Sequence, residues 1–424
     1  MAPQPTSVTL RSYQVGFGDC FLLSFRYGEE EGAEVRHVLL DFGSTALPKG
    51  LSMLDVAKQI KSACGGKLHA VIATHRHADH ISGFAGESGR IIKGLAPELV
   101  LQPWTEHPDV PEDASELPDS LRDARRFRGM LAQMHRVAES ALSEISELDN
   151  ALKTTARQLE FLGRMNLKNR PAVEALQRLK CPHVYASYGE PSGLEAILPG
   201  VKVRVLGPPT LAQSQSIRKE RERDPSEFWH LQAMASERSA ATGKPLFPNA
   251  AQVPPDQYPD NTRWFIPRLE ALRGDQLLEI VRILDEAMNN TSLILLFEVG
   301  DRKLLFPGDA QIENWEYALK TADDRDEVCA LLADVDVYKV GHHGSLNATP
   351  KTLWNLFRKK GDKTRPDRLQ TLLSTKAGKH GHTDRGTEVP CKKLEAALQE
   401  NSTLYSTQSL KSKKKPCHEV RIEV

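Results

Sequence analysis

The chain has 424 residues, of which 40% are hydrophobic and 26% are charged, so it has the composition of an ordinary globular protein rather than of a disordered, collagen-like or membrane-spanning one. Lysine plus arginine and aspartate plus glutamate number 56 each, which gives a formal net charge of +0. This balance argues against a protein that coats nucleic acid through bulk charge, although a local basic groove is compatible with it.

The first hundred residues predict a β-rich start. Short apolar segments, separated by glycine and acidic turns, occupy residues 8–10, 21–25, 35–40 and 70–73. The N-terminus lacks a charged start followed by an apolar run, and no stretch approaches the roughly 20 apolar residues of a membrane helix. The six cysteines form no C-x-x-C pair, which is typical of a reducing compartment. We therefore expect a soluble, cytoplasmic protein without a membrane span.

A long helix is predicted next. Apolar or small residues recur in alternating steps of four and three from Phe127 to Leu162, with no proline between them. This heptad pattern predicts one helix of about 36 residues, although a break near Asp149 would give a helical hairpin instead. The helix either lies on its own domain or forms a seam with a second copy, as a homodimer, or with another protein partner.

The rest of the chain alternates between strand-like segments and insertions. Strand texture returns at residues 184–185 and 201–206, and a segment rich in charge and proline follows at 211–268. A helix is predicted to end that segment, and the last third alternates strands with helices. The predicted divisions are the first half of a main domain at 1–109, a helical insertion at 110–180 and a return of core strands at 181–209. A charged and partly helical insertion follows at 210–289, and the second half of the main domain, with a basic tail, occupies 290–424.

The strongest chemical signal is a histidine cluster directly after the apolar segment 70–73. His75, His77 and His80, three of the fourteen histidines, fall within six residues. In an extended loop His75 and His77 point to the same side and can reach one metal ion, while Asp79 and His80 turn toward a neighbouring point. The pattern predicts two adjacent metal sites; the alternative is a surface histidine cluster.

Two later segments repeat this pattern of an apolar strand followed by a metal-competent side chain. The first is residues 304–306, followed by Asp309, whose carboxylate is suited to bridge two cations. Its alternative role is to cap a helix that starts at Ala310. The second is residues 335–340, followed by Gly-His-His-Gly-Ser at 341–345, where the glycines permit a tight turn that presents a histidine.

The order of these motifs, HxHxDH, a strand ending in GD and a strand ending in HHGS, resembles the metallo-β-lactamase superfamily. More narrowly, VGFGDCFLL, VLLDFGS, LLFPGDAQ and YKVGHHGS resemble the hydrolase domain of the ComEC competence family. The likeness covers residues 8–109, 181–209 and 290–410. It implies an α/β fold, the metallo-β-lactamase αββα sandwich, here with two largely helical insertions. No membrane channel is predicted, so DNA transport is not implied.

The resemblance implies a set of ligands for two divalent cations: His75 and His77 for the first metal, Asp79, His80 and His342 for the second, and Asp309 between them. Asp41 matches the buried aspartate that orients the histidine loop without binding metal. His343 then supports the ligands or faces the substrate. Asp79, His343 and His382 are the residues implied to act in catalysis. Histidine-rich ligation favours Zn²⁺, with Mn²⁺ as the alternative.

The resemblance also leaves one ligand open. Many members of the superfamily supply a third histidine to the first metal, and the candidates here are His107 and His183, each of which is otherwise an ordinary polar residue. Without it, the first metal is expected to bind weakly. His380 and His382 resemble a trailing histidine segment that protonates a leaving oxygen or holds a phosphate, and their alternative is a hydrophilic loop. Ser345 of the HHGS motif is a further possible residue of the site.

A metal-dependent hydrolase is the function that these motifs predict. No Ser-His-Asp or Cys-His spacing, P-loop or GxGxxG motif is present, so the attacking hydroxide would come from the dinuclear centre. The ComEC-like motifs favour a phosphodiesterase or nuclease that acts on nucleic acid, with bacterial defence as one context. Two alternatives remain: a hydrolase of a small phosphodiester, lactone or thioester, and an effector or assembly component that docks a partner through its helical insertions.

Overall fold

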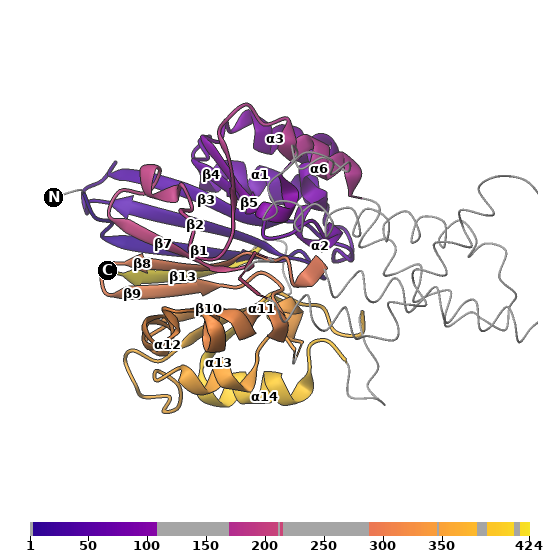
Figure 1. Ribbon diagram of the computed structural model, residues 1–424. Helices are drawn as coiled ribbons and strands as arrows, with labels where there is room; N and C mark the ends of the chain where they lie inside the picture. Colours follow the sequence, from indigo (N-terminus) through magenta and orange to yellow (C-terminus); the bar gives the residue numbers. More distant parts are fainter. Residues whose placement is uncertain are drawn as a thin grey trace, which may run out of the picture. The chain divides into compact units, whose positions relative to one another are not determined.

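The computed structural model (Figure 1) describes the following residues: 3–107, 169–210, 213–214, 288–345, 347–379, 388–410 and 416–424. The chain divides into two compact units, and the helices and strands given below belong to the first, which comprises residues 1–111, 168–213 and 287–424. The heptad segment, most of the second insertion, and His380 and His382 lie outside the described residues.

Seven strands form the first sheet, in the order β13-β1-β2-β3-β4-β5-β6. Their bounds are β1 Ser7–Tyr13, β2 Cys20–Tyr27, β3 Glu34–Phe42, β4 Ala70–Ile72, β5 Leu99–Pro103, β6 His183–Ala186 and β13 Cys417–Glu423. Strands β13, β1, β2 and β3 pair antiparallel, whereas β3, β4, β5 and β6 pair parallel. The parallel strand β4 is buried along its whole length, in keeping with its uninterrupted apolar sequence.

Six strands form the second sheet, in the order β12-β11-β10-β9-β8-β7. Their bounds are β7 Val201–Gly207, β8 Ile294–Val299, β9 Arg302–Phe306, β10 Val337–Lys339, β11 Gln370–Leu373 and β12 Thr403–Ser406. Strands β7, β8 and β9 pair antiparallel, and β9, β10, β11 and β12 pair parallel. Two residues join β8 to β9, and the first, Gly300, has the positive φ of 54° that such a tight hairpin favours.

The two sheets share one apolar cluster, to which both contribute alternate residues of their strands. Phe25 of β2 meets Phe297 of β8 with ring centroids 6.2 Å apart, and Phe21 meets Phe306 of β9 at 5.9 Å. Leu296, next to Phe297 in the chain, belongs instead to a second cluster on the other face of its sheet. The sheets therefore bury their inner faces against each other.

Helices cover the outer faces of the sheets (Figure 1). Over the first sheet lie α1 Met53–Ala63, α3 Gly86–Gly94 and α6 Arg170–Gln177; over the second lie α11 Ile312–Glu316, α12 Arg325–Ala333, α13 Lys351–Leu356 and α14 Lys392–Asn401. The short helices are α2 Ala78–Ile81, the 3-10 helices η1 Ser82–Phe84, η2 Trp104–Glu106, η5 Leu194–Ala196, η8 His342–Gly344 and η10 Thr407–Ser409, and the π-helix η7 Tyr317–Thr321. Two sheets of mixed pairing with covering helices confirm the expected α/β class.

The carboxyl ends of parallel strands from both sheets place the motif residues at one edge. Asp41 lies at the end of β3, the histidine loop at 75–80 follows β4, Asp309 follows β9, and His342 and His343 follow β10. The backbone N–H of Leu293, just before β8, donates to Thr74 O at 2.9 Å and so joins the two sheets at this edge.

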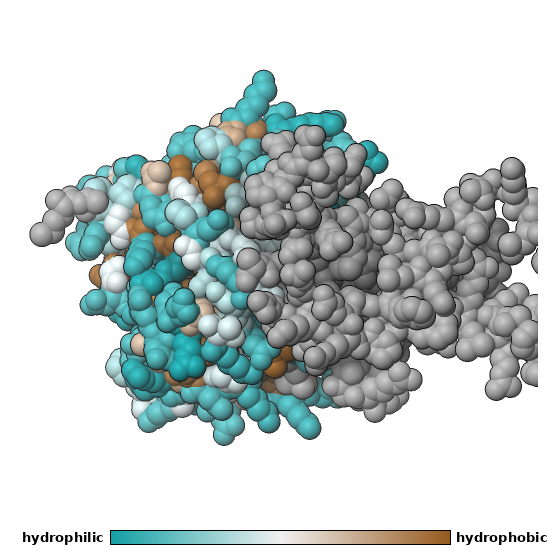
Figure 2. Space-filling view, viewed as in Figure 1, coloured by the Kyte–Doolittle hydropathy of each residue, from teal (hydrophilic) through white to brown (hydrophobic). Residues whose placement is uncertain are grey.

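The coloured part of the surface in Figure 2 is mainly hydrophilic, with scattered hydrophobic residues. Among the described residues, Ile312 and Val424 are the large hydrophobic side chains with substantial exposure, at 49% and 40%. None of the described helices combines the length and the hydrophobicity that crossing a membrane would take.

Candidate metal centre

The histidine loop leaves β4 in an extended conformation and then turns into the short helix α2. His77 stands before the first residue of α2 with φ −61° and ψ 149°. His75 and His77 lie on one side of this extended segment, with His75 Nε2 3.0 Å from His77 Nδ1. The helical turn that follows places Asp79 and His80 at a different point. The loop therefore presents two separate sets of possible metal donors, His75 with His77 and Asp79 with His80.

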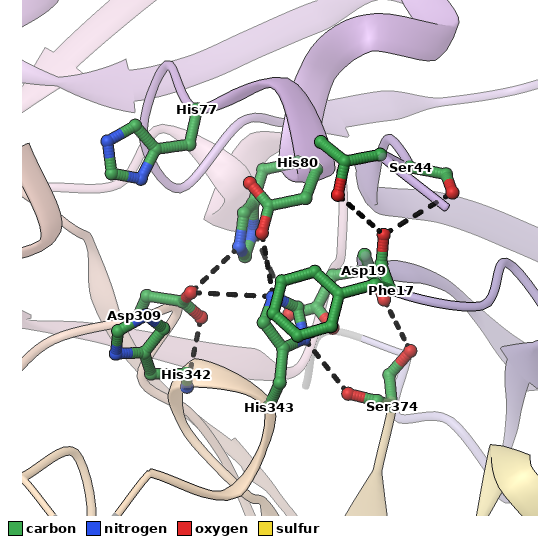
Figure 3. A network of polar contacts seen from close by, with 12 residues as sticks. Phe17, Asp19, Ser44, His77, His80, Asp309, His342, His343 and Ser374 are labelled. Atoms are coloured by element: carbon green, nitrogen blue, oxygen red, sulfur yellow. Dashed lines mark hydrogen bonds and ion pairs between the residues drawn. The ribbon is translucent and has the colours of Figure 1, made fainter. Parts of the chain in front are cut away.

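Four buried side chains from three separate segments bring their donor atoms to one point (Figure 3). They are Asp79, His80, Asp309 and His343, the last three of which Figure 3 labels, and their donor atoms all lie within 4.8 Å of one another. His343 Nε2 is 2.8 Å from Asp79 Oδ2, and His80 Nε2 is 3.0 Å from Asp309 Oδ2. The fold thus joins the histidine loop of the first sheet to the ends of β9 and β10 of the second.

The donor atoms fit a divalent cation. Among the described residues, Asp79 Oδ1, His80 Nε2 and Asp309 Oδ2 are buried and make no hydrogen bond of good geometry, although their neighbours are other donor atoms of the group. Buried polar atoms are rarely left in this condition unless something else occupies the space between them. Two imidazole nitrogens and two carboxylate oxygens form a ligand set that Zn²⁺ and Mn²⁺ both accept.

The charges of the buried side chains at the centre also favour a bound cation, because carboxylates are in excess. Asp19, Asp41, Asp79 and Asp309 are buried carboxylates, and Lys339 is the buried lysine among them. Burial of carboxylates in this number requires further positive charge close by, because an uncompensated buried charge is strongly unfavourable. A bound divalent cation would supply it.

The same carboxylates control the pKa of the two histidines of this group. Burial opposes a charge on His80, but Asp309, Asp41 and Asp79 outweigh it and raise the pKa of His80 well above its ordinary value. For His343, burial is likewise outweighed, first by Asp309 and Asp19, and its pKa is raised. The site is therefore strongly attractive to positive charge, whether that charge is a proton or a metal ion.

Asp41 fixes the orientation of His80. It has a positive φ of 56° and accepts hydrogen bonds from the backbone N–H and the hydroxyl of Thr74, both at 2.8 Å. His80 Nδ1 donates at 2.8 Å to Oδ2, the oxygen that also accepts from the Thr74 hydroxyl. Because a carboxylate can only accept, the proton resides on Nδ1 and leaves Nε2 as the ligand nitrogen.

The two consecutive histidines after β10 differ in what they contact. His343 Nδ1 donates to Ser374 O at 2.9 Å, and its ring lies 4.4 Å from that of Phe17, which aims Nε2 at Asp79. His342 contributes its backbone N–H to Asp309 Oδ1 at 3.0 Å, and its ring lies 6.2 Å from that of His343. The group of four donors thus includes His343 and not His342, whereas His342 was the ligand of the second metal expected from the sequence.

Neither His75 nor His77 belongs to the groups of three or more metal-competent donors among the described residues, and the ring of His75 lies 4.1 Å from that of His80. Arg76, between His75 and His77, makes a two-pronged ion pair with Glu106, at 2.8 to 3.1 Å, which anchors the loop from the other side. His107 packs against the ring of Tyr185 at 4.7 Å between centroids.

The other candidate third ligand, His183, donates through Nε2 to Leu179 O at 3.1 Å and stacks on Tyr185. Ser345, half-buried, donates its backbone N–H to His342 O and lies outside the four-donor group. Neither residue therefore completes a metal site in the described part of the chain.

Two residues of the centre were missed in the sequence. Lys339 Nζ lies 2.5 Å from Asp19 Oδ2 and 3.1 Å from Asp309 Oδ1, and all three side chains are almost fully buried. Asp19 also forms a three-membered donor group with Asp41 and His80. A signal was present in each case, because Asp19 stands in the motif GFGDC and Lys339 interrupts an apolar strand just before the histidines.

The chain matches no protein-family model and no curated protein. The functional interpretation therefore depends on the geometry of this centre and on the motif order that surrounds it.

Proposed function

We propose that the protein is a metal-dependent hydrolase built on the metallo-β-lactamase αββα sandwich, and that it cleaves phosphodiester bonds in nucleic acid. The observation that carries the proposal is the convergence of Asp79, His80, Asp309 and His343, in which one buried donor atom each of Asp79, His80 and Asp309 makes no hydrogen bond of good geometry. The choice of phosphodiesters is supported by the likeness of the surrounding motifs to the ComEC hydrolase domain.

The chain's own residues prepare the centre for this chemistry. A divalent cation, when bound, lowers the pKa of water toward neutrality and stabilises negative charge on a phosphoryl oxygen. Asp41 and the carbonyl of Ser374 hold the rings of His80 and His343 with Nε2 toward the centre. Asp79 retains one oxygen free of hydrogen bonds, which suits it to accept a proton from an attacking water.

The proposal is tested by hydrolysis assays on the full chain reconstituted with Zn²⁺ or Mn²⁺. The substrates are bis(p-nitrophenyl) phosphate, DNA, RNA and cyclic nucleotides, with lactones and thioesters in parallel. We expect phosphodiester cleavage, and a loss of roughly 100-fold or more in Asp309→Asn, because the substitution removes a charged ligand.

Asp336→Asn is the matched control. Asp336 is also buried and paired with a lysine, Lys359 Nζ at 2.8 Å, but it precedes β10, at the end of the strand away from the centre. Its activity should stay near that of the wild type. Cleavage of lactones or thioesters without phosphodiesters would replace the proposed substrate class, and no hydrolysis of any substrate would overturn the proposal.

A further inference from the structure

Lys339 is a buried ammonium with three oxygen atoms close to its nitrogen. It closes β10, is 0% exposed, and points its Nζ at three oxygens. These are Asp19 Oδ2 at 2.5 Å, Gly308 O at 2.7 Å and Asp309 Oδ1 at 3.1 Å. Two of its three N–H donors bond to Gly308 O and Asp309 Oδ1, and its charge pairs with the Asp19 carboxylate. Because burial of a lysine is costly without such partners, the side chain is held firmly in this position.

The two carboxylate oxygens of Asp309 differ in their contacts. Oδ1 accepts from Lys339 Nζ and from the backbone N–H of His342, at 3.1 and 3.0 Å. Oδ2 makes no hydrogen bond and lies 3.0 Å from His80 Nε2 and 3.7 Å from His343 Nε2. Turning the carboxylate so that both oxygens face the donor group would break both hydrogen bonds to Oδ1.

Lys339 also ties the two halves of the centre together. Asp19, which holds its other side, lies in the first sheet just before β2, and its backbone N–H donates to Asp79 O at 2.8 Å. The ammonium therefore spans from the histidine loop of one sheet to the Asp309 loop of the other. Loss of Lys339 would leave Asp309 Oδ1 with the backbone N–H of His342 as its hydrogen-bond donor and would remove the link between the two loops.

We propose that Lys339 is a positioning residue that restricts Asp309 to one metal-facing oxygen and thereby favours a cation of low coordination number, such as Zn²⁺, over one of high coordination number, such as Mn²⁺. This inference rests on the metal centre of the proposed function. Zn²⁺ adopts four-coordinate geometry with nitrogen and oxygen ligands, whereas Mn²⁺ accepts additional oxygen donors. A carboxylate that is free to bind through both oxygens adds one donor.

The test compares Lys339→Met with Lys359→Met by calorimetric titration of the full, metal-free chain with Zn²⁺ and with Mn²⁺. Removal of a lysine charge changes the attraction for both ions alike, since both are divalent, so the ratio of the two dissociation constants isolates coordination geometry. In Lys339→Met the preference for Zn²⁺ over Mn²⁺ should fall by about 10-fold or more. In Lys359→Met, which breaks the ion pair with Asp336 at 2.8 Å, the ratio should equal that of the wild type.

A Co²⁺-loaded sample provides a signature that a general loss of stability would not produce. The visible absorption of Co²⁺ weakens when its coordination number rises, and we expect this change in Lys339→Met alone. If Lys339→Met fails to fold, Asp19→Asn/Lys339→Met removes the charged pair together and leaves Asp309 equally released. The same ratio and spectrum are then read from that variant.

An unchanged ratio and spectrum in the variant that folds would overturn the role of Lys339 while leaving the metal centre intact. If the wild-type chain itself binds neither ion, the proposed metal centre fails, and the two results are distinguishable.

Discussion

The buried carboxylate of Asp41 determines which nitrogen of His80 carries the proton and how the ring is oriented. Asp41 accepts one hydrogen bond from His80 Nδ1 and two from Thr74, and so orients both the ring and the loop that carries it. Burial raises the pKa of Asp41, against the opposing effect of His80. The same arrangement recurs at His343, where a backbone carbonyl takes the place of the carboxylate.

The choice between the adjacent histidines gives a prediction at the residue scale. His343→Asn should lower the content of bound metal, because Nε2 of His343 belongs to the four-donor group. His342→Asn should retain the wild-type content, since the backbone N–H that contacts Asp309 is kept. Asparagine is chosen for both because it tolerates positive φ, which is 43° at His342 and 52° at His343. The measurement is metal analysis after dialysis, and loss of metal in His342→Asn alone would contradict the assignment.

At this scale the sequence identifies residues that lie in recognisable motifs and misses those defined by long-range pairing. His80, Asp79 and Asp309 were predicted as metal ligands, and the structure brings them together with His343. Lys339 was missed because its partner Asp19 is distant in the chain and no local pattern links them. Which of two successive histidines faces inward depends on a turn with positive φ, and spacing alone does not determine it.

At the scale of elements, the turns after the strands are as important as the strands. Gly308, between β9 and Asp309, has φ +56°, and a Cβ there would lie 2.8 Å from Thr74 Cβ and 3.0 Å from Ser292 Cβ. The glycine therefore permits both the turn and the close approach of the two sheets. Any side chain at this position must displace Thr74, which holds Asp41, or Ser292, whose hydroxyl accepts from the backbone N–H of Asp309.

Gly308→Ala should consequently lower both the melting temperature and the metal content. Gly378→Ala is the matched control, because Gly378 also has a positive φ, 74°, but nothing within 4 Å of its added Cβ. Both variants carry a backbone cost of about 1–2 kcal/mol. Only Gly308→Ala adds the steric conflict, so it should melt at the lower temperature in chelator and bind less metal. Equal melting temperatures and equal metal contents would show that the contact at Gly308 is unimportant.

Most strands were predicted from sequence, and the pairings were not. The apolar segments 8–10, 21–25 and 35–40 fall inside β1, β2 and β3. By contrast, β13 was not predicted, and its antiparallel pairing with β1 joins the two ends of the described chain. Periodicity reports which face of a strand is buried, whereas the choice of neighbour depends on packing between distant segments.

At the scale of the whole molecule, the centre is the place where ion pairs connect the two sheets. Charged contacts that cross from one sheet to the other include Asp79 to His343, His80 to Asp309, and Asp19 to Lys339. A cation bound among the four donors would add a further link between them. Because a ligand that binds only the folded state stabilises it, metal should raise the stability of this unit as a whole.

The most direct measurement is metal content of the full chain, by mass spectrometry after dialysis against Zn²⁺, for wild type, Asp309→Asn and Asp336→Asn. The account predicts at least one bound metal in wild type and in Asp336→Asn, and a clear loss in Asp309→Asn, with a higher melting temperature in Zn²⁺ than in chelator only where metal is retained. A wild-type chain without metal, or equal metal content in the two variants, would contradict the assignment of this centre.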